Sequence, residues 1–530
     1  MSTQTISPKT PAATRETSRR RYIPYLVFTL CASLYLLPFM RLLLQTLDEG
    51  YLIEGAVRIV RGQVFARDFF EVAGPGTFYW LALFFKLFGV TFMATRICLF
   101  VTSLGTAFLM YFLSRRVCRK YQALPCILVF STYFVALWPT INYHVDSNFF
   151  ALLALTCLVL WQDSRKSSLL LAAGALAAAT TCFLQPKGML LFLAFLVWLL
   201  IQRRRRSVSL SAFGLMLGGY FSVVGPMLLY FWSRGALKDL VYANVLFPFL
   251  HYGATNAVPY AYGLFVFYWN LWVVPTGRVN WTDGMATVLI IPFLFVTTLP
   301  ALLPVLGLWR RVDSVRPVIL LYWLCGWALW LSELHRKDIF HLVFGSPVLI
   351  ILCIYYFGEI CAKVGDVLLQ VLSISAVCLA AFNLCMVLLV AHPIRTRVGT
   401  VAMFKNDPAL AFLDQHAAPG TEIFAYPYCP MYYFLSATNN PTRYSILFYR
   451  YNTSSQYQEA IRTLDQHKVK YVLWNTDLEA KASDYSVFRA VKHMHPSDFI
   501  IEPYLESHYK IIWEKDGIRI MERKSVGDTK

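Results

Sequence analysis

The chain alternates long apolar runs with short polar connections that are rich in arginine. Because a membrane span must satisfy its backbone hydrogen bonds internally, each run predicts a transmembrane helix. Some runs are shorter than the ~20 residues of a perpendicular span, so about eleven spans are expected and roughly ten to thirteen fit the pattern. The runs lie near residues 22–44, 97–114, 125–138, 149–161, 169–185, 189–202, 208–231, 285–308, 317–332, 342–357 and 367–391.

The composition fits a polytopic α-helical membrane protein. The 530 residues are 57% hydrophobic and only 15% charged, whereas soluble domains have about 25% charged residues. A compact water-soluble enzyme is therefore excluded. The net charge of +18 comes mainly from lysine and arginine beside the ends of apolar runs, where such residues set topology and contact anionic lipid headgroups. We expect membrane lipids as partners, and we find no nucleic-acid-binding module.

The basic clusters also predict which ends of the spans face the cytoplasm. Residues 1–21 form a basic tail that the positive-inside rule places in the cytoplasm. The later clusters alternate with apolar hairpins, which leaves the loops 48–95 and 233–284 and the segment after residue 391 outside. These later clusters are residues 115–120, 165–166, 203–206 and 310–316, and Lys363.

Two elements are expected besides the spans of the transmembrane domain, residues 22–391. The apolar stretch 78–89 is too short to cross a bilayer and predicts a helix that lies on the outer face. Residues 392–530 alternate helix and strand patterns, which predicts an extracytoplasmic α/β domain. Its expected helices are 408–416 and 455–467, and its expected strands are 422–426, 470–474, 509–513 and 518–521.

Polar groups that could carry chemistry gather on the predicted outer side. Asp48 and Glu49 directly follow the first span, and adjacent carboxylates can act as a general base, position a hydroxyl or hold a metal. Polar groups beside a hydrophobic bundle are costly to desolvate, so a concentration of them indicates a site. The alternative interpretation is the solvated start of a loop.

A second polar group precedes a late span and contains Arg336, Lys337, Asp338 and His341. On a helix, Lys337 and Asp338 would neighbour His341 at spacings of four and three residues. Cations and histidine at a membrane surface suit a lipid phosphate. Interfacial snorkelling of arginine and lysine is the alternative.

Other outer polar residues belong to short connections between apolar runs. Lys187 lies in a short outer turn, against the positive-inside bias, and an anion would explain its presence. Arg41, near the outer end of the first span, is a further phosphate candidate. His144 and Asp146 share another outer turn. Snorkelling for Arg41 and a hydrated, capped turn for His144 and Asp146 are the alternatives.

A series of short motifs follows the first span. They are Asp48-Glu49-Gly50-Tyr51, Glu54-Gly55-Ala56, Arg67-Asp68-Phe69-Phe70-Glu71, Gly74-Pro75-Gly76, Tyr79-Trp80 and Ala94-Thr95-Arg96. This loop resembles the first external loop of the GT-C glycosyltransferases, which include protein O-mannosyltransferases, the lipid A aminoarabinose transferase and Rgt-like proteins. The segment from Arg336 to Leu342 and the tail segment from Asn439 to Tyr444 also resemble parts of that superfamily. The chain departs from the aminoarabinose transferase type at Gly74-Pro75-Gly76, where that type has Lys-Pro-Pro.

The resemblance implies a GT-C-like fold and an inverting glycosyltransferase. A hexose or pentose would move from a polyprenyl-phosphate donor to a hydroxyl of a glycan, lipid or protein acceptor. The family pattern implies that Asp48 is the catalytic or acceptor-positioning carboxylate, with Glu49 beside it. We expect the active site on the periplasmic or external face of a bacterial inner membrane.

The remaining candidates divide between the two substrates. The expected donor-phosphate ligands are Lys187, Arg336, Lys337, His341 and Arg41. The expected acceptor or sugar ligands are Asp68, Glu71, His144, Asp146 and Asp338.

Two questions stay open at this stage. Asp48, Glu49, Asp68 and Glu71 are enough carboxylates to hold Mg²⁺ or Mn²⁺, but lysines could stabilise the phosphate without a metal. A transporter or flippase of a lipid-linked anion is the rival function, although the repeated halves and midplane polar groups of many transporters are not apparent. An inactive relative that serves as an assembly subunit is the second rival.

Overall fold

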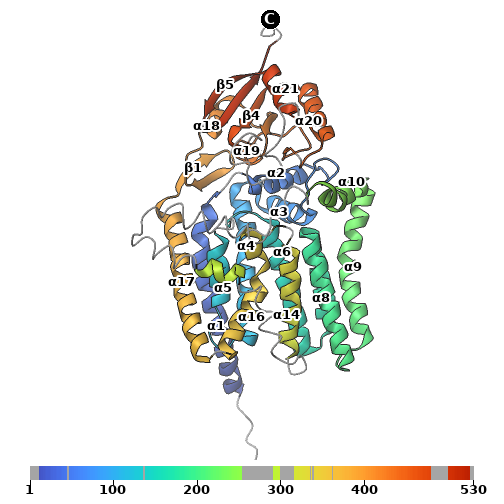
Figure 1. The fold of residues 1–530 in the computed structure, drawn as a ribbon, viewed down its shortest axis with the longest axis vertical. Coiled ribbons are helices and arrows are strands. Elements are labelled where there is room, and N and C mark those ends of the chain that lie inside the picture. Colours follow the sequence, from blue (N-terminus) through green and yellow to red (C-terminus); the bar gives the residue numbers. More distant parts are fainter. Residues whose placement is uncertain are drawn as a thin grey trace, which may run out of the picture.

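The computed structural model describes residues 11–44, 47–134, 138–252, 291–298, 316–334, 336, 339–360, 362–449, 451–478 and 499–525. Most of these residues form a bundle of roughly parallel and antiparallel helices (Figure 1). The bundle helices are α1 (Pro11–Leu36), α4 (Phe92–Val117), α5 (Leu124–Tyr133), α6 (Tyr143–Ser164), α7 (Ser167–Phe183), α8 (Gln185–Arg204), α9 (Leu210–Ser233), α14 (Pro317–Ser332), α16 (Pro347–Ile360) and α17 (Ala362–Leu389).

Six helices in the described part of the chain are long and apolar enough to cross a bilayer: α1 with its continuation to Arg41, α4, α6, α8, α9 and α17. The shorter apolar helices α5, α7, α14 and α16 pack among them. The chain is therefore an integral, multi-pass membrane protein, as the hydropathy pattern predicts. Of the run expected at 285–308, the structure describes only residues 291–298, which are helical.

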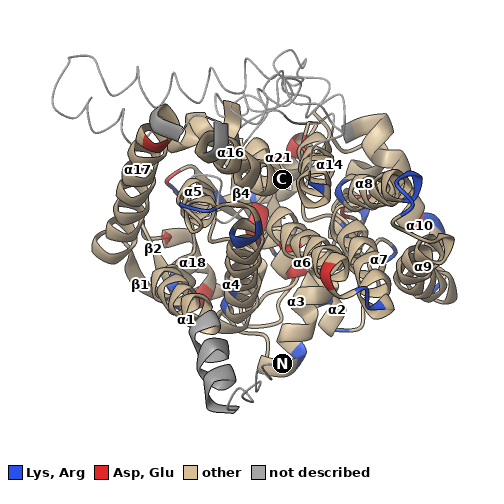
Figure 2. Ribbon diagram, turned by 90° about the horizontal axis from the view of Figure 1, so that it is seen from below, with Lys and Arg blue, Asp and Glu red and all other residues tan. Residues whose placement is uncertain are grey.

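The two ends of the bundle differ in what they carry. We call the end that carries the C-terminal sheet the sheet end, and the end where α1 begins the basic end (Figure 1). Because α4, α6 and α8 run away from the sheet, the basic connections 115–120, 165–166 and 203–206 share the basic end. Figure 2 views the molecule from this end and shows lysine and arginine on several helix termini and connections.

Two amphipathic helices, α2 (Asp48–Val60) and α3 (Pro75–Phe88), lie at the sheet end between the bundle and the sheet (Figure 1). The short helix predicted at 78–89 corresponds to α3, whereas α2 was expected to be a loop. Gly74 lets the chain pass close to the end of α7, since a Cβ there would overlap the carbonyl oxygen of Cys182. The Gly74-Pro75-Gly76 motif therefore has a packing role in this chain.

In the described part of the first 391 residues, the other named helical elements are short. They are η1 (Leu37–Arg41), α10 (Leu237–Val241), α15 (Ile339–Gly345) and two π-helical turns, η2 (Tyr242–Leu246) and η3 (Pro248–Tyr252).

The C-terminal region, residues 392–525, begins with the antiparallel hairpin of β1 (His392–Thr396) and β2 (Gly399–Met403). A four-stranded sheet of order β3-β4-β6-β5 follows, in which only the β3–β4 pair is parallel. Its strands are β3 (Ile423–Tyr426), β4 (Tyr471–Asn475), β5 (Tyr509–Lys515) and β6 (Ile518–Arg523). Its helices are α18 (Pro408–His416), α19 (Met431–Leu435), α20 (Ser454–Gln466), the short η5 (Thr476–Leu478) and α21 (Ile501–His508).

The strands and helices expected in the tail are present within a few residues of their predicted limits. The predicted class, a helical membrane bundle with a C-terminal α/β region, is confirmed. The β1–β2 hairpin, α19, η5 and α21 were not anticipated.

Backbone contacts fix the C-terminal region onto the sheet end of the bundle. Leu43 donates its amide to the carbonyl of Ala402 at 2.8 Å, and Phe70 donates to the carbonyl of Arg443 at 2.8 Å. The N-terminal end of α2 meets α19 without space for a side chain, because a Cβ on Gly50 would overlap the backbone nitrogen of Met431. The start of α2 is thus buried under the C-terminal region.

Candidate active site

Asp48 begins α2 and is half-buried. Its Oδ1 accepts a hydrogen bond of 2.6 Å from the phenol of Tyr428, which follows β3 in the C-terminal region. A carboxylate in the first turn of a helix is also stabilised by the helix dipole. The carboxylate predicted after the first span is therefore held by its own helix, α2, and by Tyr428 of the C-terminal region.

Glu49 is fully buried and belongs to a different environment. It forms an ion pair with Arg96 of α4, and it accepts the amide of Ile141 at 2.9 Å. Arg96 also donates to the carbonyl of Leu42 at 2.9 Å and lies over the ring of Phe92. Glu49 thereby ties the start of α2 to α4 and to the connection before α6.

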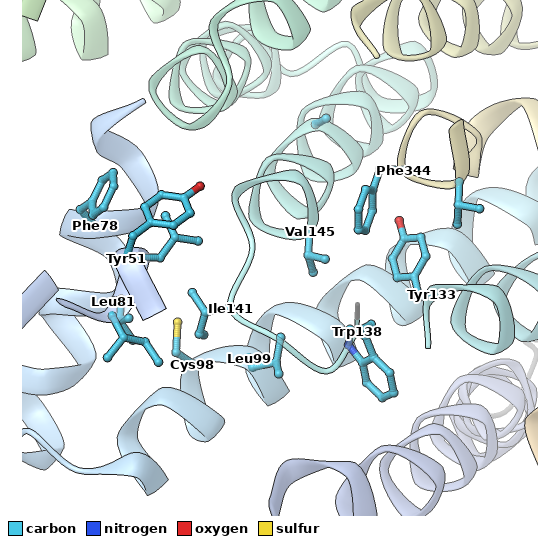
Figure 3. Packing of buried hydrophobic residues seen from close by; sticks show 14 of the residues in the cluster. Tyr51, Phe78, Leu81, Cys98, Leu99, Tyr133, Trp138, Ile141, Val145 and Phe344 are labelled. Carbon is cyan, nitrogen blue, oxygen red and sulfur yellow. The ribbon is translucent and has the colours of Figure 1, made fainter. Parts of the chain in front are cut away.

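Tyr51 extends the polar surroundings of Asp48 along α2. Burial raises its pKa, and the neighbouring groups Tyr143, Glu71 and Asp48 raise that pKa further. Figure 3 shows the Tyr51 ring turned toward the side on which Ile141 and Val145 lie. The α2 helix thus directs a buried phenol toward the start of α6.

Glu71 follows in the loop between α2 and α3 and is buried. Its Oε1 has no hydrogen-bond partner among the described residues, and burial raises the pKa of its carboxyl well above the ordinary value. Asn244 of η2 holds this loop by donating to the carbonyls of Val72 at 2.9 Å and Ala73 at 3.1 Å. The loop therefore presents a buried carboxyl that has capacity for another hydrogen bond.

A second polar cluster joins α6, α8 and the end of α14. The ammonium of Lys187 lies 2.7 Å from Oε1 of Glu333 and donates to Oδ1 of Asn148 at 2.9 Å. Nδ1 of His144 lies 3.0 Å from the same Glu333 oxygen. All four side chains are buried. The ring of His341, on α15, lies 5.0 Å from the ring of His144, centroid to centroid.

The structure brings some predicted site residues together and separates others. Lys187, His144 and His341 share the Glu333 cluster, and Arg336 adjoins it by donating its amide to the carbonyl of Glu333 at 3.2 Å. Lys337 and Asp338 lie outside the described residues.

The other predicted residues lie apart from that cluster. Asp146 is buried and accepts a hydrogen bond of 3.0 Å from Thr77 of α3. Asp68 accepts from Arg67 and from the amide of Val64, and the hydrogen bond from Arg67 lowers the pKa of its carboxyl. Arg41 is exposed at the end of η1.

The acidic residues considered for a metal do not gather. Glu49 is paired with Arg96, and Asp68 is paired with Arg67. Within the part of the chain that the structure describes, no three histidine, cysteine or acidic side chains form a group with metal-binding spacing.

Several residues of the site were not anticipated from the sequence. Glu333 directly follows an apolar run, where a buried carboxylate is costly, and this cost could have indicated that Glu333 belongs to a site. Glu54 and Arg58 form a buried ion pair on α2, and Arg58 donates to the carbonyl of Thr442 at 2.7 Å. Nothing in the sequence around Tyr428 indicates its role, because its contact with Asp48 joins residues that are 380 positions apart.

A hollow of about 340 Å³ opens beside α3, at the C-terminal end of α2 and away from Asp48. It has apolar walls that include Ile59 and Leu83, and it also contains Lys86 and Arg234. Tyr79 and Tyr230 line it as well, with their phenol oxygens 3.3 Å apart. This combination of apolar surface and cations suits a lipid that carries a phosphate.

Comparison with known proteins agrees with the GT-C resemblance. Residues 72–250 match the family model described as dolichyl-phosphate-mannose-protein mannosyltransferase. This match spans α3 to η3 and contains neither Asp48 nor Glu333. No curated protein sequence matches the chain significantly.

The fold is that of ArnT from Cupriavidus metallidurans. The structure of ArnT bound to undecaprenyl phosphate superposes with a TM-score of 0.57 at 11% identity, over 95% of this chain and 98% of ArnT. The apo structure of the same protein gives a TM-score of 0.54 at 11% identity with the same coverage. The likeness extends over nearly the full length of both chains, so it includes the C-terminal region as well as the bundle.

Proposed function

We propose that this chain, which has the GT-C fold of ArnT and matches the mannosyltransferase family over residues 72–250, is an integral-membrane glycosyltransferase. Since ArnT was solved bound to undecaprenyl phosphate, we propose a polyprenyl-phosphate-linked sugar as donor. The acceptor would be a hydroxyl of a glycan, lipid or protein. The observation that carries this proposal is the half-buried Asp48 carboxylate, held by Tyr428 at the sheet end of the bundle.

In the proposed reaction, Asp48 orients the acceptor hydroxyl and takes its proton. The acceptor oxygen bonds to the anomeric carbon as the bond from that carbon to the phosphate oxygen breaks. Polyprenyl phosphate leaves with the bonding electrons, and the configuration at the anomeric carbon inverts. Tyr428 keeps the carboxylate in one orientation. This contributes to the rate, because fixed geometry supplies much of an enzyme's rate enhancement.

We propose that Arg336, Lys337 and His341 contact the donor phosphate, because cations aimed at the developing charge stabilise a leaving phosphate. Lys187 would act indirectly, through the residues that surround it, since its ammonium is buried against Glu333 and Asn148. We propose the same indirect role for His144, whose Nδ1 contacts the same Glu333 oxygen.

For the acceptor or sugar we favour Glu71, whose buried carboxyl has capacity for a further hydrogen bond. Its raised pKa favours the protonated form, which can donate to a sugar hydroxyl. We propose a structural role for Asp146 and Asp68, which bind Thr77 and Arg67.

The same reasoning gives a proposal for orientation. Cytoplasmic connections of membrane proteins carry an excess of lysine and arginine. The basic end would then face the cytoplasm, and Asp48 and the C-terminal region would lie on the external face, in a bacterial inner membrane.

The proposal is tested by Asp48→Asn, which keeps the side-chain shape and removes the base. With purified full-length protein and a labelled polyprenyl-phosphate sugar, we expect transfer to fall by more than about a hundredfold, within the range that general base catalysis contributes. Asp68→Asn is the matched control, because it changes another aspartate of the same external segment and should retain most activity.

Transfer by Asp48→Asn within tenfold of the parent would show that another group is the base. Movement of intact donor across vesicles by the parent, without release of polyprenyl phosphate to any acceptor, would establish the transporter instead. If the parent shows no transfer and no movement of donor, the assembly subunit is the favoured function.

A further inference from the structure

A cavity of about 550 Å³ lies at the basic end of the bundle, where the ends of α4, α14 and α16 meet. Its described lining contains four arginines and no aspartate or glutamate. The lining residues are Arg115, Arg116, Val117, Cys118, Arg119, Gln122, Arg316 and Tyr355.

This cavity is separate from the site around Asp48. Arg96, which pairs with Glu49, and Arg115 both belong to α4 and are 19 positions apart. At about 1.5 Å of rise per residue, the helix separates them by about 28 Å. The proposed sugar transfer therefore does not use the cavity.

Aromatic rings hold three of the arginines in place. The guanidinium of Arg115 lies 4.7 Å from the ring centroid of Tyr25 and 5.7 Å from that of Tyr111. Arg116 lies 5.1 Å from the ring of Phe112, and Arg316 lies 5.6 Å from the ring of Tyr355. Guanidinium groups stacked in this way lose little conformational freedom when they bind an anion.

One of these guanidiniums has a donor that no described residue satisfies. Nη1 of Arg115 is buried and has no hydrogen-bond partner among the described residues. Leaving a buried charged donor without a hydrogen bond costs free energy, so this donor indicates that a ligand with an acceptor atom binds here. Arg116, in contrast, donates to Asp163 at 2.6 Å.

The cavity also differs from an ordinary basic connection at the same end. Arg203 and Arg204 end α8, Arg205 and Arg206 follow in the turn after it, and all four are exposed. General electrostatic attraction to anionic headgroups is enough to explain exposed arginines of this kind. The cavity instead brings arginines from two chain segments, around residues 115–119 and at residue 316, onto the walls of one half-open cavity.

We propose that this cavity binds a phosphate anion, either the headgroup of an anionic phospholipid or free inorganic phosphate. Arginine binds phosphate oxygens in pairs, and a site built from separate segments can approach the anion from more than one direction. Occupation would link the ends of α4, α14 and α16. The ligand is therefore expected to stabilise the bundle.

The test uses the full-length protein in nanodiscs of phosphatidylcholine with increasing phosphatidylglycerol, and inorganic phosphate as the soluble probe. For the parent we expect saturable binding of phosphatidylglycerol, observed as lipid retained in native mass spectrometry and as a higher unfolding midpoint. The double variant Arg115→Gln/Arg316→Gln should bind at least tenfold more weakly. The control Arg203→Gln/Arg204→Gln removes the same charge at the same end and should bind like the parent.

The probes distinguish the two sources of phosphate. Stabilisation by phosphatidylglycerol that millimolar inorganic phosphate does not compete away identifies a lipid headgroup, and stabilisation by phosphate alone identifies a free anion. If the double variant does not fold, the exposed Arg119→Gln replaces it, with a smaller loss of affinity expected. Equal losses in the cavity and control variants, or no loss in either, would overturn the proposal.

Discussion

Asp48 and Glu49 are neighbours in the chain, yet the fold gives them unlike surroundings. The sequence predicts that a carboxylate pair follows the first span, because the residue types and their position are visible there. It does not predict which member is buried, since the partner of Glu49 is Arg96 on another helix and the partner of Asp48 is Tyr428. At this scale the chemistry is predictable and the pairing is not.

The Glu49–Arg96 pair gives the first stability prediction. Glu49→Ala leaves a buried guanidinium without its counter-ion, which should destabilise the protein by roughly 3–5 kcal/mol. Thermal unfolding in detergent would measure the loss, with Asp48→Asn as a near-neutral control. Replacing both partners by methionine should recover part of the loss, and a parent-like midpoint for Glu49→Ala would contradict the buried pair.

Glu71 gives a prediction about pH. Its pKa in the folded protein is raised above the ordinary 4.5 by burial. Stabilisation from the protonated form is thus complete below pH 4.5 and is lost as the pH rises through the folded-state pKa. Glu71→Gln stays neutral, so its unfolding midpoint relative to the parent should rise between pH 4.5 and pH 8. A constant difference across this range would show that Glu71 does not change its protonation on folding.

At the scale of elements, the sequence predicts the bundle helices and the strands of the tail, because long apolar runs and alternating patterns depend only on local residues. It misses α2, whose Glu54 and Arg58 make the segment read as a polar loop. The structure explains the miss, since these two side chains neutralise each other and Arg58 also binds the carbonyl of Thr442. The spacing of Glu54 and Arg58, four residues apart, is itself a local signal of a helix, whereas the contact with Thr442 has none.

The Glu333 cluster gives the prediction that belongs to helix packing. Glu333→Ala leaves Lys187 buried between α8 and α14 without its carboxylate, and the expected destabilisation is again roughly 3–5 kcal/mol. The double variant Glu333→Leu/Lys187→Met should recover much of this stability in thermal unfolding. If it also recovers sugar transfer, Lys187 serves packing alone. If transfer stays low at parent-like stability, Lys187 supports the donor phosphate as we propose.

At the scale of the whole molecule, the C-terminal region completes the candidate site instead of standing apart from it. The sequence predicts that this region exists and that it is α/β, since its helix and strand patterns are local. Where it rests is not predictable in this way. The contact depends on close fits such as that of Gly50 against Met431, which only the folded arrangement reveals.

Tyr428→Phe tests this interface without disturbing its packing. Loss of a hydrogen bond to an ionised group costs about 1.5–3 kcal/mol of stability, and because the bond also orients the proposed base we expect a loss of sugar transfer of about tenfold or more. Tyr432→Phe is the matched control, because its phenol donates to Asp407 in the same region at 2.7 Å. Equal activity of the two variants would show that Tyr428 does not position the base.

The contact between Asp48 and Tyr428 also has a consequence for how the protein is made. A nascent chain that has reached residue 391 already contains the bundle helices through α17, yet the ribosome has not yet added the tyrosine that holds the aspartate. The proposed transferase therefore becomes active only near the end of translation. A chain stalled or truncated after its last span would remain in the membrane without consuming lipid-linked sugar.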